Sequence, residues 1–153
     1  MRGQEACEQA ERKAMMATLA HAAADEITRL WDGSGLPCEA ELLRGPETGL
    51  VTVRGRIGGG GAPFNVGEAT VTRATVRLPS GQVGHSYALG RDKGKAKLAA
   101  IADALWQDPV HREAIATKLV EPLRTALEEA REKRRVETAA TKVDFFTMVR
   151  GED

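Results

Sequence analysis

The sequence has no excess of charge, few aromatic residues and no long apolar run, and each shortage excludes a class of function. Its 22 basic and 22 acidic side chains cancel, and only 4% of its residues are aromatic, so a nucleic-acid-binding protein is not expected. No stretch approaches the roughly 18 apolar residues that cross a bilayer. The first residues, MRGQEACEQAERKAMM, are charged throughout and lack the apolar core of a signal peptide. We therefore expect a cytoplasmic protein with neither a membrane nor a nucleic acid as a partner.

Cysteine and histidine are also scarce, which argues against a metal site. Cys7 and Cys38 have neither a CxxC nor a Cys/His spacing, so we expect two reduced thiols. The histidines lie too far apart to share a metal ion: His85 falls on the apolar parity of a strand and is expected to be buried, whereas His21 and His111 are expected to be exposed. No GxSxG, HExxH or carboxylate pair is present. These residues predict no catalytic group, no metal and no bound cofactor.

The apolar periodicity changes along the chain. Residues 4–31 place apolar side chains on one stripe at helical spacing. Four segments alternate apolar and polar residues as strands do: 37–43, 49–57, 67–78 and 83–90. We expect a loop over residues 44–48, and a bulge near Thr72 and Arg73 would restore the alternation of the third strand. The apolar face of the fourth strand is predicted to comprise Val83, His85, Tyr87 and Leu89.

Helical spacing returns after residue 91. Asp92 is the predicted N-cap of one helix, Asp108 and Pro109 are the predicted N-cap and first residue of the next, and Pro122 starts a third. This order predicts an α+β fold, an antiparallel four-stranded meander packed with N-terminal and C-terminal helices. We assign residues 1–138 to a single domain and 139–153 to an apolar C-terminal tail.

Positive charge is concentrated in the middle third of the chain. Residues 44–97 carry nine basic and three acidic side chains, a net of +6 in a neutral protein. This imbalance suits a small anionic ligand or an acidic partner, and the candidate contacts are Arg54, Arg56, Arg73, Arg77, Arg91 and Lys93. The alternative is a solvated basic face. The segment RGRIGGGG lacks both the GK[ST] of a P-loop and a GxGxxG fingerprint, so it predicts a mobile loop or a loop that orders against a partner.

The last residues, VDFFTMVRGED, are unusually apolar for a chain end. Phe145 and Phe146 fall on opposite faces of an extended segment, and Met148 and Arg150 follow Phe146 at the same parity. Such a segment must be covered. It either folds back on its own sheet or enters a partner subunit, and we favour the partner because aromatic and methionine anchors are typical of interfaces.

Four stretches together resemble one known family. These stretches are RKAMMATLAHA (12–22), PETGLVTVRGRIGGGGAPFNVGEATVTRATVRL (46–78), GHSYALGRDKGKAKLAAIADAL (84–105) and the terminal VDFFTMVRGED (143–153). In this order they are similar to the PhnG family, the G subunit of the bacterial carbon–phosphorus lyase core complex. The long charged stretch 110–137 corresponds to the family's variable region.

The resemblance implies a function that composition does not. It implies assembly with core subunits H, I and J and with an ABC-type ATP-binding protein. The complex is expected to displace adenine from MgATP with an alkylphosphonate, giving α-D-ribose 1-alkylphosphonate 5-triphosphate. MgATP is then a substrate of the complex, and this subunit is inactive alone. The resemblance implies that the I subunit carries the nucleosidase chemistry and that the J subunit later cleaves the C–P bond by iron–sulfur radical chemistry. The alternative is a stand-alone module that binds an anion or a nucleotide.

Overall fold

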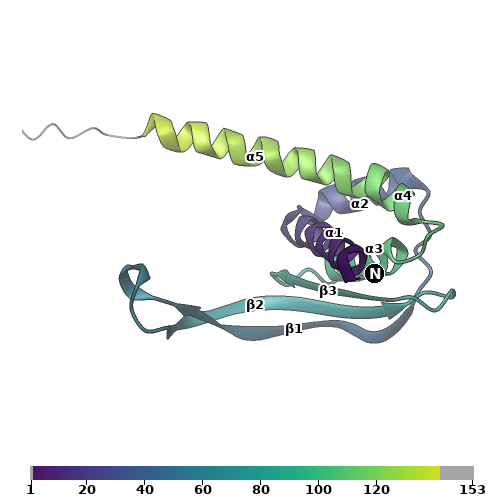
Figure 1. Ribbon diagram of the computed structural model, residues 1–153, viewed down its shortest axis with the longest axis horizontal. Coiled ribbons are helices and arrows are strands. Elements are labelled where there is room, and N and C mark those ends of the chain that lie inside the picture. Colours follow the sequence, from purple (N-terminus) through teal and green to yellow (C-terminus); the bar gives the residue numbers. More distant parts are fainter. Residues whose placement is uncertain (1, 142–153) are drawn as a thin grey trace, which may run out of the picture.

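The computed structural model describes residues 2–141 of the chain, which form three layers (Figure 1). The elements are α1 (Arg2–His21), α2 (Ala24–Ser34), β1 (Glu41–Gly55), the 3-10 turn η1 (Ile57–Gly59), β2 (Phe64–Arg77), β3 (Val83–Leu89), α3 (Lys93–Trp106), α4 (Arg112–Ile115), the π-helix η2 (Ala116–Val120) and α5 (Glu121–Ala140). The sheet is one layer, α1 and α3 lie on one of its faces, and α2, α4 and α5 lie above them. The α+β class follows, while the tail from residue 142 onward lies outside the described residues.

The sheet has three antiparallel strands in the order β1-β2-β3, so the predicted four-stranded meander is wrong. The predicted strands 37–43 and 49–57 belong to one strand, β1, which continues through the expected loop. The register with β2 shifts between Leu42 and Arg44 and again between Arg44 and Glu47, so the extra residues bulge out of the pairing. Because β1 is an edge strand, it tolerates the bulges and the missing N–H of a proline.

The bulge predicted at Thr72 and Arg73 is also misplaced. These residues keep an unbroken register with β3 and pair regularly with Thr48 and Glu47, and the extra residues lie in β1 between Leu42 and Glu47. The alternation of β2 changes phase because both of its faces carry apolar side chains. Val71 is buried on the face away from the helices, whereas Thr72 and Val76 are buried on the face toward α3.

The buried face of β3 is the opposite of the predicted one. Gly84, Ser86 and Ala88 point toward α3, whereas His85 and Tyr87 are exposed on the other face. The physical reason is how closely the helix approaches the strand. A Cβ placed on Gly84 would lie 2.5 Å from the backbone nitrogen of Ala104 and would also overlap the carbonyl of Ala100. Only the small residues of β3 can occupy this contact, so the larger ones face outward.

The N-terminal helical segment is broken into two helices rather than running unbroken over 4–31. The break lies at Ala22 and Ala23, between α1 and α2. There the Nζ of Lys95 donates hydrogen bonds to the carbonyls of Ala20 (2.8 Å) and Ala22 (2.6 Å), so a side chain of α3 satisfies the last carbonyls of α1. This break turns α2 so that its Ile27 joins the core.

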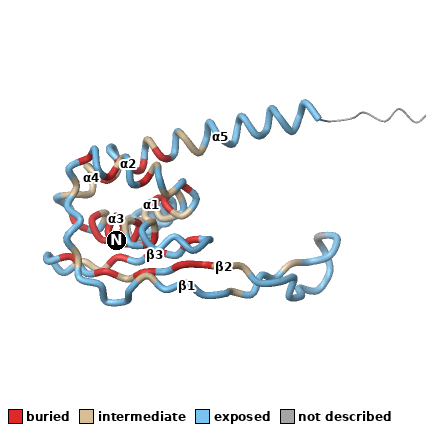
Figure 2. Tube along the Cα trace, turned by 180° about the vertical axis from the view of Figure 1, so that it is seen from behind, coloured by how far each residue is buried: buried red, intermediate tan, exposed pale blue. Residues whose placement is uncertain are grey.

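The core lies between the helices and the inner face of the sheet (Figure 2). Its largest fully buried side chains are Met15, Leu19, Ile27, Ile101, Leu105, Ile115, Leu119 and Leu123. They come from α1, α2, α3 and the long C-terminal helical segment, so burial of these apolar groups joins all the helices into one unit.

One of the three predicted helix starts in the second half of the chain needs correction. Asp92 is the N-cap of α3 as predicted, and its carboxylate accepts a hydrogen bond of 2.7 Å from the backbone N–H of Lys95. Asp108 and Pro109 instead lie in a turn before α4. Pro122 lies in the first turn of α5 as predicted, although α4, η2 and α5 follow one another without a break. The π-helix directly before Pro122 widens the helix where the proline ring would otherwise clash with the preceding turn.

Two elements project beyond the body on the same side (Figure 1). The first is the outer part of the β1–β2 hairpin, since β3 pairs with β2 only from Val71 to Arg77. The second is α5, whose residues 128–140 are all exposed. Both projections are pale blue in Figure 2, which separates them from the buried centre of the molecule.

The contact between Gly84 and α3 gives a direct test of this packing. Gly84→Ala is expected to lower the free energy of unfolding by about 1–3 kcal/mol, because the added methyl group overpacks the helix–strand contact. Gly67→Ala is the matched control, since a Cβ there meets no atom within 4 Å, and its effect should stay within about 0.5 kcal/mol. Urea denaturation measures both, and equal midpoints for the two variants would contradict the packing described here.

Candidate functional site

The structure separates the six predicted cationic contacts into three places. Arg54 and Arg56 lie on the projecting part of the hairpin, Arg73 and Arg77 lie on β2 within the body, and Arg91 and Lys93 lie at the start of α3. All six are exposed. The four strand arginines do not form one cluster, because the antiparallel register brings other residues opposite them.

Arg73 and Arg77 are paired with carboxylates of the neighbouring strand. Arg73 Nη2 lies 3.2 Å from Glu47 Oε2, and Arg77 Nη1 lies 3.7 Å from Glu41 Oε2. Each glutamate stands directly opposite its arginine in the β1–β2 register. These are cross-strand pairs at about half exposure, of a kind that contributes up to about 1 kcal/mol each. Their charges are therefore balanced within the sheet itself.

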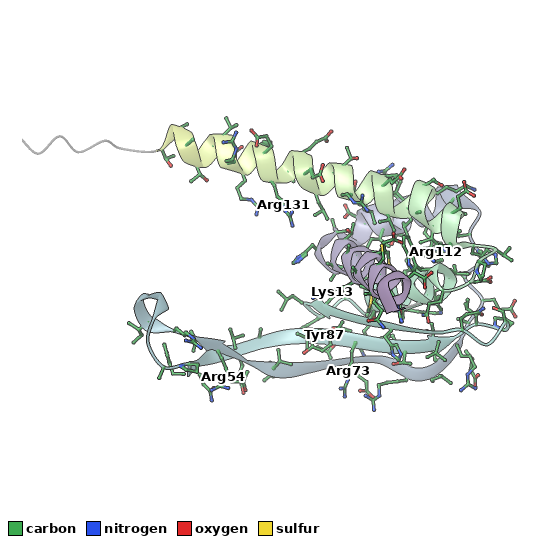
Figure 3. The ribbon with its side chains drawn as sticks, in the orientation of Figure 1. Lys13, Arg54, Arg73, Tyr87, Arg112 and Arg131 are labelled. Carbon is green, nitrogen blue, oxygen red and sulfur yellow. The ribbon has the colours of Figure 1, made fainter. Side chains whose placement is uncertain are left out.

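Arg54 and Arg56 have a different environment from that of Arg73 and Arg77. Arg54 stands opposite Asn65 rather than a carboxylate, and Arg56 follows the end of β1. Within residues 2–141, neither arginine has a carboxylate at ion-pair distance. Figure 3 labels Arg54 on the hairpin, well away from the helices of the body. These two positive charges are available to another molecule.

The start of α3 is a poor anion site although it is rich in lysine. The carboxylate of Asp92 already accepts the N–H of Lys95, so a negative charge occupies the N-cap position. The side chain of Lys95 reaches the C-terminal carbonyls of α1, and burial lowers its pKa from the ordinary lysine value. The cationic side chains that remain exposed around this end are Arg91, Lys93 and Lys97.

The main buried polar group is Asp103, which the sequence analysis did not single out. Its side chain has no exposed surface, and it accepts bonds of 2.7 Å from both Nε and Nη2 of Arg12. The backbone N–H of His85 donates a third bond of 2.9 Å. The hydrogen bonds to Asp103 raise the pKa of Arg12, outweighing the opposing effect of its partial burial. The signal for this site was a single aspartate inside the apolar stretch LAAIADAL, since a buried carboxylate requires a partner.

A second polar group lies in the turn before α4. Asp108 Oδ2 is 2.9 Å from His111 Nδ1, and Asp108 Oδ1 accepts the N–H of Val110. The bond with His111 is the main reason that the pKa of Asp108 is below its ordinary value. Arg112 Nη2 pairs with Glu11 Oε2 at 2.9 Å. The pair of Arg112 with Glu11 connects the start of α4 to α1. His111 was expected to be exposed, but it is half-buried.

None of these groups forms a catalytic constellation within the part of the chain that the structure describes. No set of three or more His, Cys, Asp or Glu side chains in residues 2–141 is arranged to hold a metal ion. Cys7 and Cys38 are free and exposed. No helix of the described residues has the length and apolar character needed to cross a membrane. Asp103 and Lys95 instead connect one helix or strand to another.

Comparison with known proteins identifies the family. The family model described as "Phosphonate metabolism protein PhnG" matches residues 10–151, which is most of the chain. The chain belongs to the PhnG family. A PhnG relative from Rhizobium meliloti (strain 1021) is 54% identical over 144 residues, covering 94% of this chain and 92% of the relative. That relative is named alpha-D-ribose 1-methylphosphonate 5-triphosphate synthase subunit PhnG. The PhnG match includes Phe145, Phe146, Met148 and Arg150, which lie outside the described residues.

Removing the buried carboxylate of Asp103 should destabilise the fold. Asp103→Ala is expected to lower the free energy of unfolding by about 3 kcal/mol, because it leaves Arg12 and the N–H of His85 without their partner. The control is Glu11→Ala, which removes an exposed ion pair and should cost less than about 1 kcal/mol. Urea denaturation compares the two variants, and a loss for Asp103→Ala no larger than that of Glu11→Ala would refute this role.

Proposed function

We propose that this chain is the G subunit of an α-D-ribose 1-methylphosphonate 5-triphosphate synthase and that its role in that complex is architectural. The observation that carries the proposal is 54% identity, across 94% of the chain, to a relative whose name states that activity. A relative this similar shares the fold described above.

The distribution of charged side chains supports an architectural role. Asp103, Lys95 and Lys118 each contact a helix or strand other than their own: Lys118 Nζ donates to the carbonyl of Ser34 at the end of α2 (2.9 Å). Buried or partly buried charges with such partners stabilise the arrangement of elements and are not free for chemistry. The outer hairpin and the outer part of α5, by contrast, are exposed along most of their length (Figure 2).

The proposed reaction replaces one bond at the ribose. A phosphonate oxygen forms a bond to C1′ of the ribose of MgATP, and the glycosidic bond to adenine breaks, so adenine leaves with the electron pair. We assign this chemistry to the partner subunits and expect the chain to bind no cofactor of its own. The proposed partners are the H, I and J core subunits and an ABC-type ATP-binding protein. Because MgATP is the substrate, we assign the complex to the cytoplasm.

The competing function is a stand-alone module that binds an anion or a nucleotide. It would depend on exposed cations gathered at one site. In the described residues the six candidates lie in three places, Arg73 and Arg77 are paired with glutamates, and Asp92 occupies the start of α3. This dispersal favours the subunit over the module.

Reconstitution separates the two functions. The chain co-expressed with the other synthase subunits should co-purify with them, and the complex should release adenine from MgATP when methylphosphonate is added. The chain alone should release none, and the other subunits without it should lose activity or fail to assemble. Calorimetry of the isolated chain with ATP is the second measurement. Binding of ATP by the isolated chain at micromolar concentration, or adenine release by it, would reject the architectural role.

The C-terminal tail gives a separate prediction, which rests on sequence alone. If Phe145 and Phe146 are anchors in a partner, Phe145→Ala with Phe146→Ala should weaken assembly at least tenfold, since burying each phenylalanine contributes roughly 1.5–3 kcal/mol. The melting temperature of the isolated chain should be unchanged. The matched control is Val136→Ala, which truncates an exposed apolar side chain of α5. If the double variant instead melts well below the wild type and still assembles, the tail packs on its own domain.

A further inference from the structure

The outer part of the β1–β2 hairpin, residues 50–67 and here called the arm, carries an unusual share of exposed apolar surface. Of the eleven large apolar side chains exposed in the described residues, five belong to this short segment: Leu50, Val53, Ile57, Phe64 and Val66. Three of them are highly exposed, Ile57 at 76%, Leu50 at 63% and Val66 at 60%. A concentration of exposed apolar side chains of this kind on a small protein is typical of a docking site.

The body of the protein does not support the arm. Strand β3 pairs with β2 only as far as Val71, and Figure 1 shows the arm continuing past the ends of β3, α1 and α3. The arm is therefore a ribbon of two strands without a covering layer. A two-stranded hairpin is only marginally stable in water by itself, so cover from another chain would stabilise it.

The backbone of the arm is also accessible. Beyond Thr70, whose carbonyl accepts the N–H of Gly90, the side of β2 away from β1 has no neighbouring strand in the described residues. Its edge from Asn65 to Ala69 can pair with an added strand. At the tip, four consecutive glycines, 58–61, carry no side chain that would keep a partner's backbone at a distance.

Charge determines what kind of partner fits. The arm contains Arg54 and Arg56, and the acidic residue nearest to it in β2 is Glu68, which directly follows the arm and stands opposite Thr52. In contrast to Arg73 and Arg77, neither arginine of the arm is paired with a carboxylate of residues 2–141. A second copy of the arm would bring four arginines into one patch, and like charges at an interface oppose association. A matching surface must be apolar at its centre and acidic at its rim.

We propose that the arm is the element by which this subunit docks onto a different subunit of the synthase, in an apolar groove rimmed by aspartate or glutamate. This inference rests on the proposed function, since it takes the partner from the same complex. The apolar side chains enter the groove, Arg54 and Arg56 pair with the acidic rim, and the free edge of β2 accepts a strand of the partner.

The test uses the full chain co-expressed with the other synthase subunits. Ile57→Ser with Val66→Ser should weaken the affinity of the chain for the assembled partners about a hundredfold, since buried interface anchors each contribute about tenfold or more. The matched control is Val110→Ser with Val136→Ser, which changes two side chains equally exposed outside the arm (81% and 56%) and should bind as the wild type does. The melting temperature of each isolated variant shows that the body has folded.

The charge requirement is tested by a second pair of variants, which preserves the apolar surface. Arg54→Ala with Arg56→Ala should slow association several-fold at low salt, and the difference from the wild type should shrink as salt screens the charges. Arg29→Ala with Arg124→Ala is the control, because both are exposed arginines on helices of the body. Equal association rates for the two double variants would contradict the proposal that the partner's groove has an acidic rim.

The outcomes separate this inference from the proposed function. If the wild-type chain binds no synthase subunit, the proposed function fails and the docking inference fails with it. If the wild type assembles and both arm variants assemble equally well, the function stands and the inference about the arm is wrong. If the isolated chain is a dimer in sedimentation experiments and Ile57→Ser with Val66→Ser makes it a monomer, the occupant is a second copy, which also overturns the inference.

Discussion

The arrangement of the body depends on one buried carboxylate. Asp103 on α3 holds Arg12 of α1 through two hydrogen bonds and the backbone of β3 through a third, so it orients three elements at once. Each bond is short and the carboxylate is fully buried, which makes the arrangement specific: a shift of any element would leave a buried polar group unsatisfied. Lys95 stabilises the turn between α1 and α2 in a similar way, because its Nζ donates hydrogen bonds to two carbonyls at the end of α1.

This fixed geometry holds α3 unusually close to β3. The strand meets the helix through Gly84, Ser86 and Ala88, and Ser86 Oγ donates a bond of 2.6 Å to the carbonyl of Ala96. Small residues inside leave larger ones outside, so Tyr87 is 54% exposed on the opposite face. The core is therefore compact and made largely from helices, and it does not extend under the outer hairpin. The apolar side chains of that hairpin are left for a surface supplied from elsewhere.

The charged groups divide into two sets with different consequences. One set is used within the molecule: Arg12 with Asp103, Arg73 with Glu47, and Lys95 with carbonyls. The other set, on the hairpin, has no carboxylate partner in the described residues. The protein is neutral, and the charges inside it are paired. Its unpaired cations lie beside exposed apolar side chains, as is typical of a subunit of a complex. This division is consistent with a chain of the PhnG family whose residues 2–141 hold no group of side chains arranged to bind a metal ion.

The sequence by itself determined the features that depend on nearby residues or on the order of motifs. Helical periodicity, the Asp92 cap, the α+β class and the family followed from it, and the family was confirmed by comparison. Only the tertiary structure decided which face of β3 is buried, because Gly84 fits under α3 and a larger residue does not. It also decided that β1 is one strand and that Arg73 meets Glu47, since register joins residues far apart in the chain. Alternation identifies two faces of a strand, but only the partner that packs against it selects the inner one.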